Sequence, residues 1–324
     1  MPHSTTRPDA LPPSPTLAAI GLDLAFRLAA RTPDSIRSAA GALLARVDPL
    51  ASPARRDGLR RNLETISAWG HPLLASEAGR RHAERAIFGS YHRGFLDYLA
   101  HRRLGSGAAA NVRVVGAERL YRALAAGRGA VVTAPHLGSW ELAGMALARQ
   151  GFRIHVVTGV QYHAALTHAF LAAKREERIE VSTPEEGFLP LLRTLRSGGL
   201  VILLADGDVF RRGVAVRFFG TTATFPAGPA LIARRSGAPI VHAFATRDAD
   251  GTHRIVFESM DAPDRSATID ADVARLAQGV ASAVERAVAG HLTEWCIFRP
   301  LFATAEEAPG HGATTSPTAS IHAA

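Results

Sequence analysis

The stretch AVVTAPHLGSWELAGMALARQ, residues 130–150, places a histidine between two regular elements. Residues 130–134 have the length and composition of a buried strand, and residues 142–150 carry the apolar spacing of a helix. His136 therefore follows the end of a predicted strand, and Glu141 lies five positions later in the first turn of the next helix. In open α/β sheets, ligands usually bind in the crevice outside the carboxyl ends of the strands. The stretch thus predicts a strand–loop–helix unit with a base and a carboxylate available for chemistry, although a histidine that merely caps or packs would have the same spacing.

Strands and helices alternate on both sides of this unit, which indicates βαβ units and a parallel sheet. We therefore predict an α/β fold with a mostly parallel central sheet flanked by helices. The predicted strands are 112–115, 130–134, 153–158, 179–182, 200–205, 214–219, 239–245 and 254–258, and the predicted helices of this part are 118–126, 141–150, 164–178, 185–197, 228–235 and 270–290.

The first hundred residues are predicted to be helical, without the strand-like runs of the later part. Apolar residues recur at helical spacing in 57–67 and 80–103, and Thr32-Pro33-Asp34 is a typical helix start. Residues 17–30 form a short apolar helix that either packs on the domain or lies in a membrane interface. We predict a disordered leader at 1–16, one domain at 17–302 and a disordered tail at 303–324. Within the domain, a helical N-terminal layer (17–110) precedes the α/β core (111–302).

Composition limits the classes of partner. Cys296 is the only cysteine, which excludes an internal disulfide and a multi-cysteine zinc site. The formal net charge is +8, and Lys174 is the only lysine among 37 basic residues. Arginine binds phosphate and carboxylate through a planar fork, so a phosphate-rich membrane surface or an acidic carrier protein fits this charge. A GC-rich genome would produce the same arginine bias. The scattered basic residues and the absence of a recognition motif argue against nucleic acid.

The sequence carries no evident membrane span or signal peptide. No stretch approaches the ~20 apolar residues that cross a bilayer. Residues 1–15 contain five prolines and no apolar core, unlike a secretory signal. We therefore expect the protein to be made and kept in the cytosol.

A second polar group follows another predicted strand. Asp206-Gly207-Asp208 comes directly after the apolar run 200–205, so it is expected to share a cleft with His136. Taken alone, these residues fit a turn, a divalent-metal site of a nucleotide-sugar glycosyltransferase, or a carboxylate cluster beside a histidine site. The sequence contains neither a G-x-S-x-G elbow nor a P-loop, which disfavours an ordinary serine hydrolase and a P-loop nucleotide site.

The segment His136-Leu-Gly-Ser-Trp-Glu141 resembles the H-x4-[DE] motif of the lysophospholipid acyltransferase superfamily. It is most similar to the bacterial branch that acylates lipid A precursors and phosphatidylinositol mannosides, where glutamate is usual at the place of Glu141. Further blocks resemble that branch in the same order, and together they cover about residues 61–302. They are Arg61-Asn62-Leu63, Asp206-Gly207-Asp208 with Gly213 and Phe218-Phe219-Gly220, residues 225–239, and Glu294-Trp295 with Phe298-Arg299-Pro300.

The resemblance implies a glycerolipid acyltransferase-like fold and an O-acyltransferase that needs no metal or other cofactor. The acyl group would pass directly from acyl-CoA or acyl-ACP (acyl carrier protein) to a hydroxyl of a membrane glycolipid, such as a lipid A precursor or a phosphatidylinositol mannoside. His136 is expected to take the hydroxyl proton, and Glu141 to accept a hydrogen bond from the other ring nitrogen. Backbone N–H groups near Gly138, or at the N-terminus of the helix that follows, are candidates for the oxyanion.

The remaining expectations concern substrates and location. Lys174 or Arg175 would hold a phosphate of the donor or the acceptor, and Asp206 and Asp208 would orient the site or bind acceptor hydroxyls. We expect a peripheral or interfacial enzyme at the cytoplasmic face of the inner membrane, in contact with anionic lipid. The alternatives are a metal-dependent glycosyltransferase that uses Asp206-Gly207-Asp208 and a non-catalytic lipid-binding protein of the same fold.

Overall fold

The computed structural model describes residues 31–103, 112–158, 174–207, 213–248 and 250–302, with Leu28 and Leu171 as single residues. The predicted leader, the tail, most of the apolar helix at 17–30 and most of the helix at 164–178 lie outside these ranges. The bounds of the helices and strands that were predicted within them agree with the structure to within a few residues, with one exception at 185–197.

A seven-stranded sheet forms the centre of the molecule, in the order β1-β9-β8-β2-β5-β3-β4. β8 and β9 run antiparallel, and the other neighbouring pairs are parallel, which confirms the mostly parallel α/β sheet. The strands are β1 Val112–Val115, β2 Ala130–Ala134, β3 Ile154–Val157, β4 Glu180–Ser182, β5 Leu200–Leu204, β8 Ile240–Arg247 and β9 His253–Asp261.

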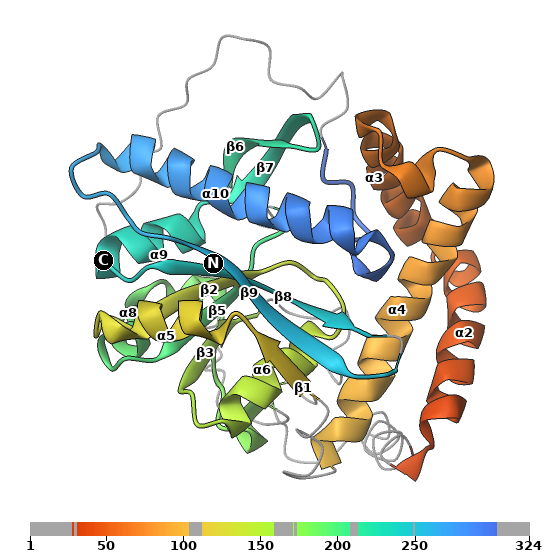
Figure 1. Ribbon diagram of the computed structural model, residues 1–324, viewed down its shortest axis with the longest axis horizontal. Helices are drawn as coiled ribbons and strands as arrows, with labels where there is room; N and C mark the ends of the chain where they lie inside the picture. The colour runs from red at the N-terminus through yellow and green to blue at the C-terminus, as the bar shows by residue number, and fades with distance from the viewer. Residues whose placement is uncertain are drawn as a thin grey trace, which may run out of the picture.

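Helices cover both faces of this sheet (Figure 1). α8 (Leu189–Arg196), α9 (Gly228–Ser236) and α10 (Ile269–Gly290) contribute apolar side chains to one core cluster. α5 (Ala117–Ala125) and α6 (Trp140–Arg149) contribute to a second cluster on the other face. Because both faces are buried, the central strands are apolar on both sides, which is why β2 and β5 appear in the sequence as continuous apolar runs.

Two local features were not predicted. The helix expected at 185–197 is divided into a 3-10 turn, η3 (Pro184–Glu186), and α8, because Gly187 has φ 69° and ψ −160°, a conformation that interrupts a helix. β6 (Gly213–Phe218) does not join the main sheet but pairs with an unexpected strand, β7 (Thr221–Pro226). Positive φ at Phe219 and Gly220 forms the tight turn between them.

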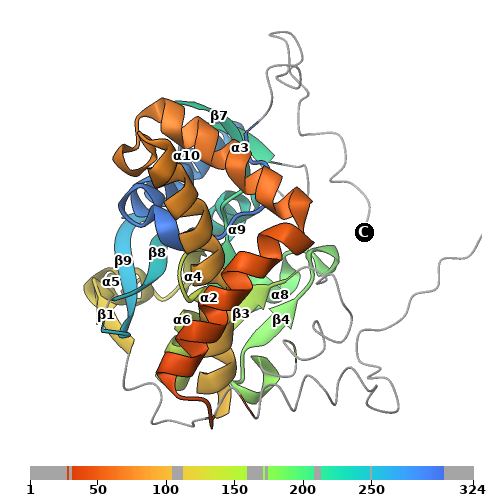
Figure 2. The same ribbon diagram turned by 90° about the vertical axis from the view of Figure 1, so that its right-hand side faces the viewer.

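The helical N-terminal layer lies across one end of the sheet. It consists of α2 (Asp34–Ala51), α3 (Pro53–Trp69) and α4 (Glu77–Arg103), with the short turn η1 (Pro72–Leu74) between α3 and α4 (Figure 2). α4 packs against α2 and against η4 (Leu292–Glu294), and Gly94 on α4 approaches the carbonyl oxygen of Gly138. The layer therefore reaches the loop that carries His136. No helix in the described part of the chain has the length and apolar character needed to cross a membrane.

Candidate active site

His136 and Asp206 meet because their strands are neighbours in register. β2 and β5 are parallel, with Ala134 opposite Leu204, so the residues two positions after each strand end lie side by side. The Nδ1 atom of His136 is 2.7 Å from Oδ1 of Asp206, and the backbone N–H of His136 donates to Oδ2 over 2.7 Å. The His136 side chain is 30% exposed, whereas that of Asp206 is fully buried. A ring with one nitrogen bound to a buried carboxylate and part of its surface open is suited to general base catalysis.

The carboxylate of Asp206 also accepts a hydrogen bond from the indole Nε1–H of Trp295, over 2.9 Å. Both of its oxygens therefore already receive N–H donors from the protein. A divalent cation at Asp206 would have to displace these donors, so the arrangement does not fit the glycosyltransferase alternative. Asp208 lies outside the described residues. Among the residues that are described, no group of three or more metal-binding side chains is placed to hold an ion.

The hydrogen-bond partner of Glu141 differs from the predicted one. Its Oε2 atom accepts a hydrogen bond from Nζ of Lys174, while Asp206 occupies the position at Nδ1 of His136 that we predicted for Glu141. The physical reason is the register of β2 and β5, which places Asp206 beside the His136 ring. Glu141 lies in the first turn of α6, and its side chain contacts Lys174 instead. Lys174 is buried in this pair, and Arg175 beside it is exposed. Lys174 thus reaches the motif, although the partner it contacts is a carboxylate of the protein.

Gly138 packs closely against Glu294 of η4 and Ala245 of β8. Its φ is +60°, and its N–H donates to the carbonyl oxygen of Glu294 over 2.9 Å. The Gly138 amide, one of the two candidates for the oxyanion, thus already donates within the protein. A Cβ at this position would lie 2.4 Å from the carbonyl oxygen of Ala245, so only glycine fits. The N-terminus of α6, which follows directly, has no side-chain cap and keeps free N–H groups near the loop.

Comparisons with known proteins show which family the chain belongs to. The model of the bacterial lipid A biosynthesis acyltransferase family matches residues 11–304. The chain belongs to this family. It is 30% identical over 249 residues to a phosphatidylinositol mannoside acyltransferase of Mycobacterium tuberculosis (strain CDC 1551 / Oshkosh), covering 75% of each chain. It is 29% identical over 248 residues to the protein of the same name from Mycolicibacterium smegmatis, covering 75% of this chain and 78% of the relative. The expected acyltransferase branch is confirmed, and the protein is an O-acyltransferase.

A groove of about 420 Å³ adjoins the active-site loop of this acyltransferase. Small residues of α2 and α4, together with Gly138 and Ser139, form much of its lining. Two arginines also line it, and both pair with Asp97: Arg93 at 2.9 Å and Arg247 at 3.4 Å. The lining residues are Ser38, Ala42, Ala86, Gly89, Ser90, Arg93, Gly94, Gly138, Ser139, Arg247, Thr293 and Glu294.

Glu294 is a polar residue of this groove whose environment the sequence did not reveal. Its Oε2 atom accepts a hydrogen bond from the backbone N–H of Arg247 over 3.0 Å. Burial raises the pKa of this carboxyl to about 7, against an ordinary value of 4.5, while the Arg247 N–H partly opposes the shift. The side chain therefore changes charge close to neutral pH, directly beside the loop that carries His136.

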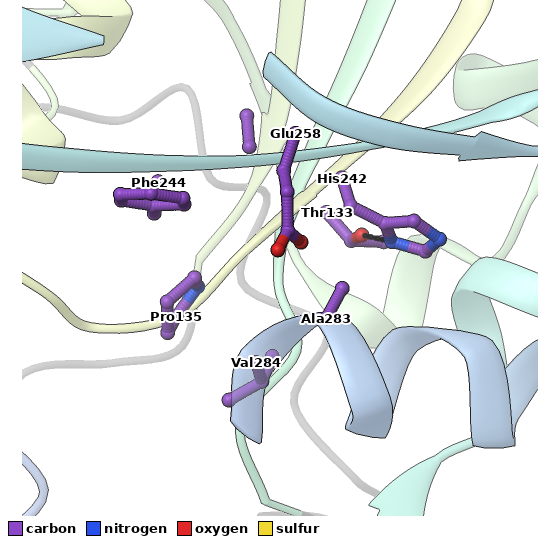
Figure 3. Close-up of a pocket in the computed structure, with 8 residues that line it drawn as sticks. Thr133, Pro135, His242, Phe244, Glu258, Ala283 and Val284 are labelled. Atoms are coloured by element: carbon purple, nitrogen blue, oxygen red, sulfur yellow. Dashed lines mark hydrogen bonds between the residues drawn. The ribbon is translucent and has the colours of Figure 1, made fainter. Parts of the chain in front are cut away.

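A second polar cluster includes Thr133 of β2 and His242 of β8, and Figure 3 shows the contact between these two side chains. Oγ1 of Thr133 is 2.8 Å from Nδ1 of His242, and Nε2 of His242 is 2.9 Å from Oδ2 of Asp261. The hydrogen bond with His242 lowers the pKa of Asp261. The cavity beside Thr133 and Glu258 has a volume of about 10 Å³, which is room for one water molecule. Although this order of residues is similar to a hydrolytic triad, no substrate fits, and we assign the cluster to structure.

Proposed function

We propose that this acyltransferase moves a fatty acyl group from an acyl thioester to a hydroxyl of a membrane glycolipid, with His136 as the general base and Asp206 as the carboxylate that orients it. The 2.7 Å contact between Nδ1 and the buried carboxylate carries the proposal. With Nδ1 committed to Asp206, Nε2 is the ring nitrogen left for a substrate. The mycobacterial relatives are phosphatidylinositol mannoside acyltransferases by name, which supports a glycolipid acceptor.

In the proposed reaction, Nε2 of His136 takes the proton of the acceptor hydroxyl while its oxygen attacks the thioester carbonyl carbon. The free N–H groups at the N-terminus of α6 stabilise the oxyanion that forms. The tetrahedral intermediate collapses, the C–S bond breaks, and the thiolate leaves and takes up the proton. Asp206 stabilises the transient imidazolium. No acyl-enzyme and no metal or other cofactor take part.

The groove beside Gly138 is proposed to receive the acyl chain of the donor. Alanine and glycine at positions 42, 86 and 89 leave the space open, and the two arginines in its lining each form ion pairs with both Asp34 and Asp97. Replacing Ala86 by leucine should narrow the groove and lower kcat/KM roughly tenfold for long-chain donors, with a smaller effect on short ones. Ala78→Leu, at an exposed position of the same helix, is the matched control. Equal chain-length profiles for the two variants would exclude the groove as the acyl site.

The outer face of α2 supports a location at the membrane surface. Ile36, Leu43, Val47 and Leu50 lie on one side of this helix and are between 50% and 73% exposed, whereas Ala45 on the other side is buried against the domain. Contiguous exposed apolar side chains on an amphipathic helix are typical of interfacial binding. In Figure 2 this helix lies at the front of the N-terminal layer. We propose that α2 contacts anionic lipid at the cytoplasmic face of the inner membrane, with the acyl-CoA or acyl carrier protein donor approaching from the cytosol.

Vesicle sedimentation tests this surface. The double variant Leu43→Asp/Val47→Asp should lower the fraction bound to anionic vesicles at least tenfold, because the variant loses two aliphatic side chains that the membrane would bury. Ile269→Asp is the control, since Ile269 is similarly exposed at the far end of α10. Unchanged sedimentation of the double variant would contradict the assignment.

The reaction itself is tested by mass spectrometry of membrane lipids from cells that carry either the wild-type protein or His136→Ala. The wild-type protein should produce a glycolipid heavier by one acyl group, and His136→Ala should not, although its thermal unfolding stays normal. The acylated product in His136→Ala cells would exclude His136 as the base. The mass difference would also identify the acyl chain and the acceptor.

A further inference from the structure

We propose that Trp295 is a positioning residue for acyl transfer, which fixes the carboxylate of Asp206 and, through it, the ring of His136. The inference rests on the proposed role of His136 as the base. It assigns a function to a tryptophan that lies 89 positions from Asp206 in the sequence and has no direct contact with a reacting atom in the proposed mechanism.

The hydrogen bonds of Asp206 define the orientation of its carboxylate. Oδ1 receives Nδ1–H of His136, and Oδ2 receives both the His136 backbone N–H and the indole N–H of Trp295. The Asp206 side chain and Trp295 are fully buried, so water does not compete for these positions. Among the described residues, three donors on two oxygens hold the carboxylate plane, and the tryptophan supplies the one that does not belong to His136.

The chain segment that contains Trp295 also forms backbone hydrogen bonds with the loop that carries His136. The N–H of Cys296 donates to the carbonyl oxygen of His136 over 2.7 Å, and Leu137 and Trp295 form an antiparallel bridge. With the Gly138 contact to Glu294, residues 294–296 pair with residues 136–138 as a short added strand. The segment that contains Trp295 is therefore connected to His136 in two ways, through the backbone N–H of Cys296 and through the hydrogen bond of Trp295 to Asp206.

α3 binds the part of the chain that follows Trp295 and Cys296. Nδ2 of the buried Asn62 donates to the carbonyl oxygen of Arg299 over 2.8 Å, and the N–H of Leu301 donates to Oδ1 of Asn62 over 2.9 Å. Gly58, one turn earlier, permits the close approach, because a Cβ there would lie 2.2 Å from the carbonyl oxygen of Phe298. The position of Trp295 is thus defined by the fold on both sides, and its indole N–H is directed at the carboxylate without freedom to turn away.

Two effects on the reaction follow from the indole hydrogen bond. It restricts rotation of Asp206, so that Oδ1 stays in line with Nδ1 of His136. It also withdraws charge from the carboxylate, which moderates how strongly Asp206 stabilises the protonated imidazole. Without the N–H, the carboxylate would be less well oriented, and so would the ring of His136.

The test is Trp295→Phe, which keeps an aromatic ring in the core and removes the N–H. We expect kcat to fall roughly 10- to 100-fold, as is usual when a partner behind a catalytic ligand or base is lost, with KM changed less than twofold. The pH profile of kcat should also differ from that of the wild type. Trp69→Phe is the matched control, because Trp69 packs on Phe219 at the surface and its substitution should leave kcat and the pH profile unchanged.

A double-mutant cycle with Asp206→Asn separates this role from a general packing effect. If Trp295 acts through Asp206, Trp295→Phe should change kcat less than twofold in the Asp206→Asn background. The same 10- to 100-fold loss in both backgrounds, or a wild-type kcat and pH profile for Trp295→Phe, would overturn the proposal.

Two measurements keep the test decisive. If Trp295→Phe unfolds, replacement of Trp295 by the isosteric 3-benzothienylalanine removes the N–H without loss of volume, and the same kinetic outcomes apply. Activity of His136→Ala is measured in the same assay. Full activity there would refute the proposed function, whereas an inactive His136→Ala together with a normal Trp295→Phe would refute only the role of the tryptophan.

Discussion

His136 and Asp206 are 70 residues apart in sequence and form a 2.7 Å contact between Nδ1 and Oδ1 at the ends of adjacent parallel strands. The contact depends on the register of β2 and β5 and on the equal distance of the two residues from their strand ends. Glu141, the acidic residue of the motif itself, is paired with Lys174 instead. The acidic residue closest in sequence to the histidine is therefore distinct from the acidic residue that contacts its ring.

Asp206→Asn and Glu141→Gln distinguish these two carboxylates. Asp206→Asn preserves shape but removes the charge that selects the tautomer of His136, so kcat should fall on the order of 10³-fold. Glu141→Gln leaves the Nδ1 contact intact and should lower kcat less, while it leaves the buried Lys174 without its ionised partner. Steady-state kinetics of the two variants and of the wild type, at matched pH, provide the measurement.

The controls for this comparison are the thermal midpoints. Loss of a buried ion-pair partner costs stability, so Glu141→Gln should unfold at a lower temperature than the wild type. If Glu141→Gln instead loses more kcat than Asp206→Asn while both remain folded, the glutamate would be the orienting carboxylate in the reacting enzyme.

The sequence predicted the sheet and the strand ends at which the candidate site lies, because both depend on local patterns. Apolar runs mark the buried strands, and polar residues directly after them mark the strand ends. The partner of His136 depends on which strands are neighbours, and this is a long-range property. The positions of His136 and Asp206 shortly after two apolar runs were the available signal, but nothing local shows that β5 rather than β3 lies beside β2.

The contacts of Trp295 and Asn62 were beyond the sequence for the same reason. The resemblance to the acyltransferase branch identified the blocks that contain them, without saying that they touch. In the structure, the blocks around Asn62, Asp206 and Trp295 form a hydrogen-bonded frame around His136. These blocks, which are far apart along the chain, therefore meet at one site in the structure.

Gly138→Ala should disrupt the active-site loop. The substitution places a Cβ 2.4 Å from the Ala245 carbonyl oxygen and forces a non-glycine residue to a φ of +60°. We expect a loss of roughly 1–3 kcal/mol in the free energy of unfolding and a kcat reduced along with it, because the loop that carries His136 must shift. Urea denaturation and kinetics measure both effects. Gly144→Ala on α6, where a Cβ meets nothing within 4 Å, is the control and should be neutral or stabilising.

Cys296 should report on the integrity of the site. Burial raises the pKa of its thiol well above the ordinary range, and the residue is 5% exposed. The native protein should therefore react slowly with an aromatic disulfide reagent, and the denatured chain should react rapidly with one thiol per chain. Asn62→Leu, which releases the segment that follows Cys296, should accelerate labelling of the native state. Rapid labelling of the wild-type protein without denaturant would show that this segment opens readily.

Glu294 should make stability depend on pH near neutrality. Its folded pKa of about 7 lies above the ordinary 4.5, so the folded state binds this proton more tightly than the unfolded chain does. The corresponding stabilisation is complete below pH ~4.5 and is lost as the pH rises through 7, a change of roughly 1–3 kcal/mol. Glu294→Gln keeps an acceptor for the Arg247 N–H and removes the titration. The free energy of unfolding of the wild type, measured from pH 5 to pH 8, should therefore fall relative to that of Glu294→Gln, and parallel curves for the two proteins would contradict the assignment.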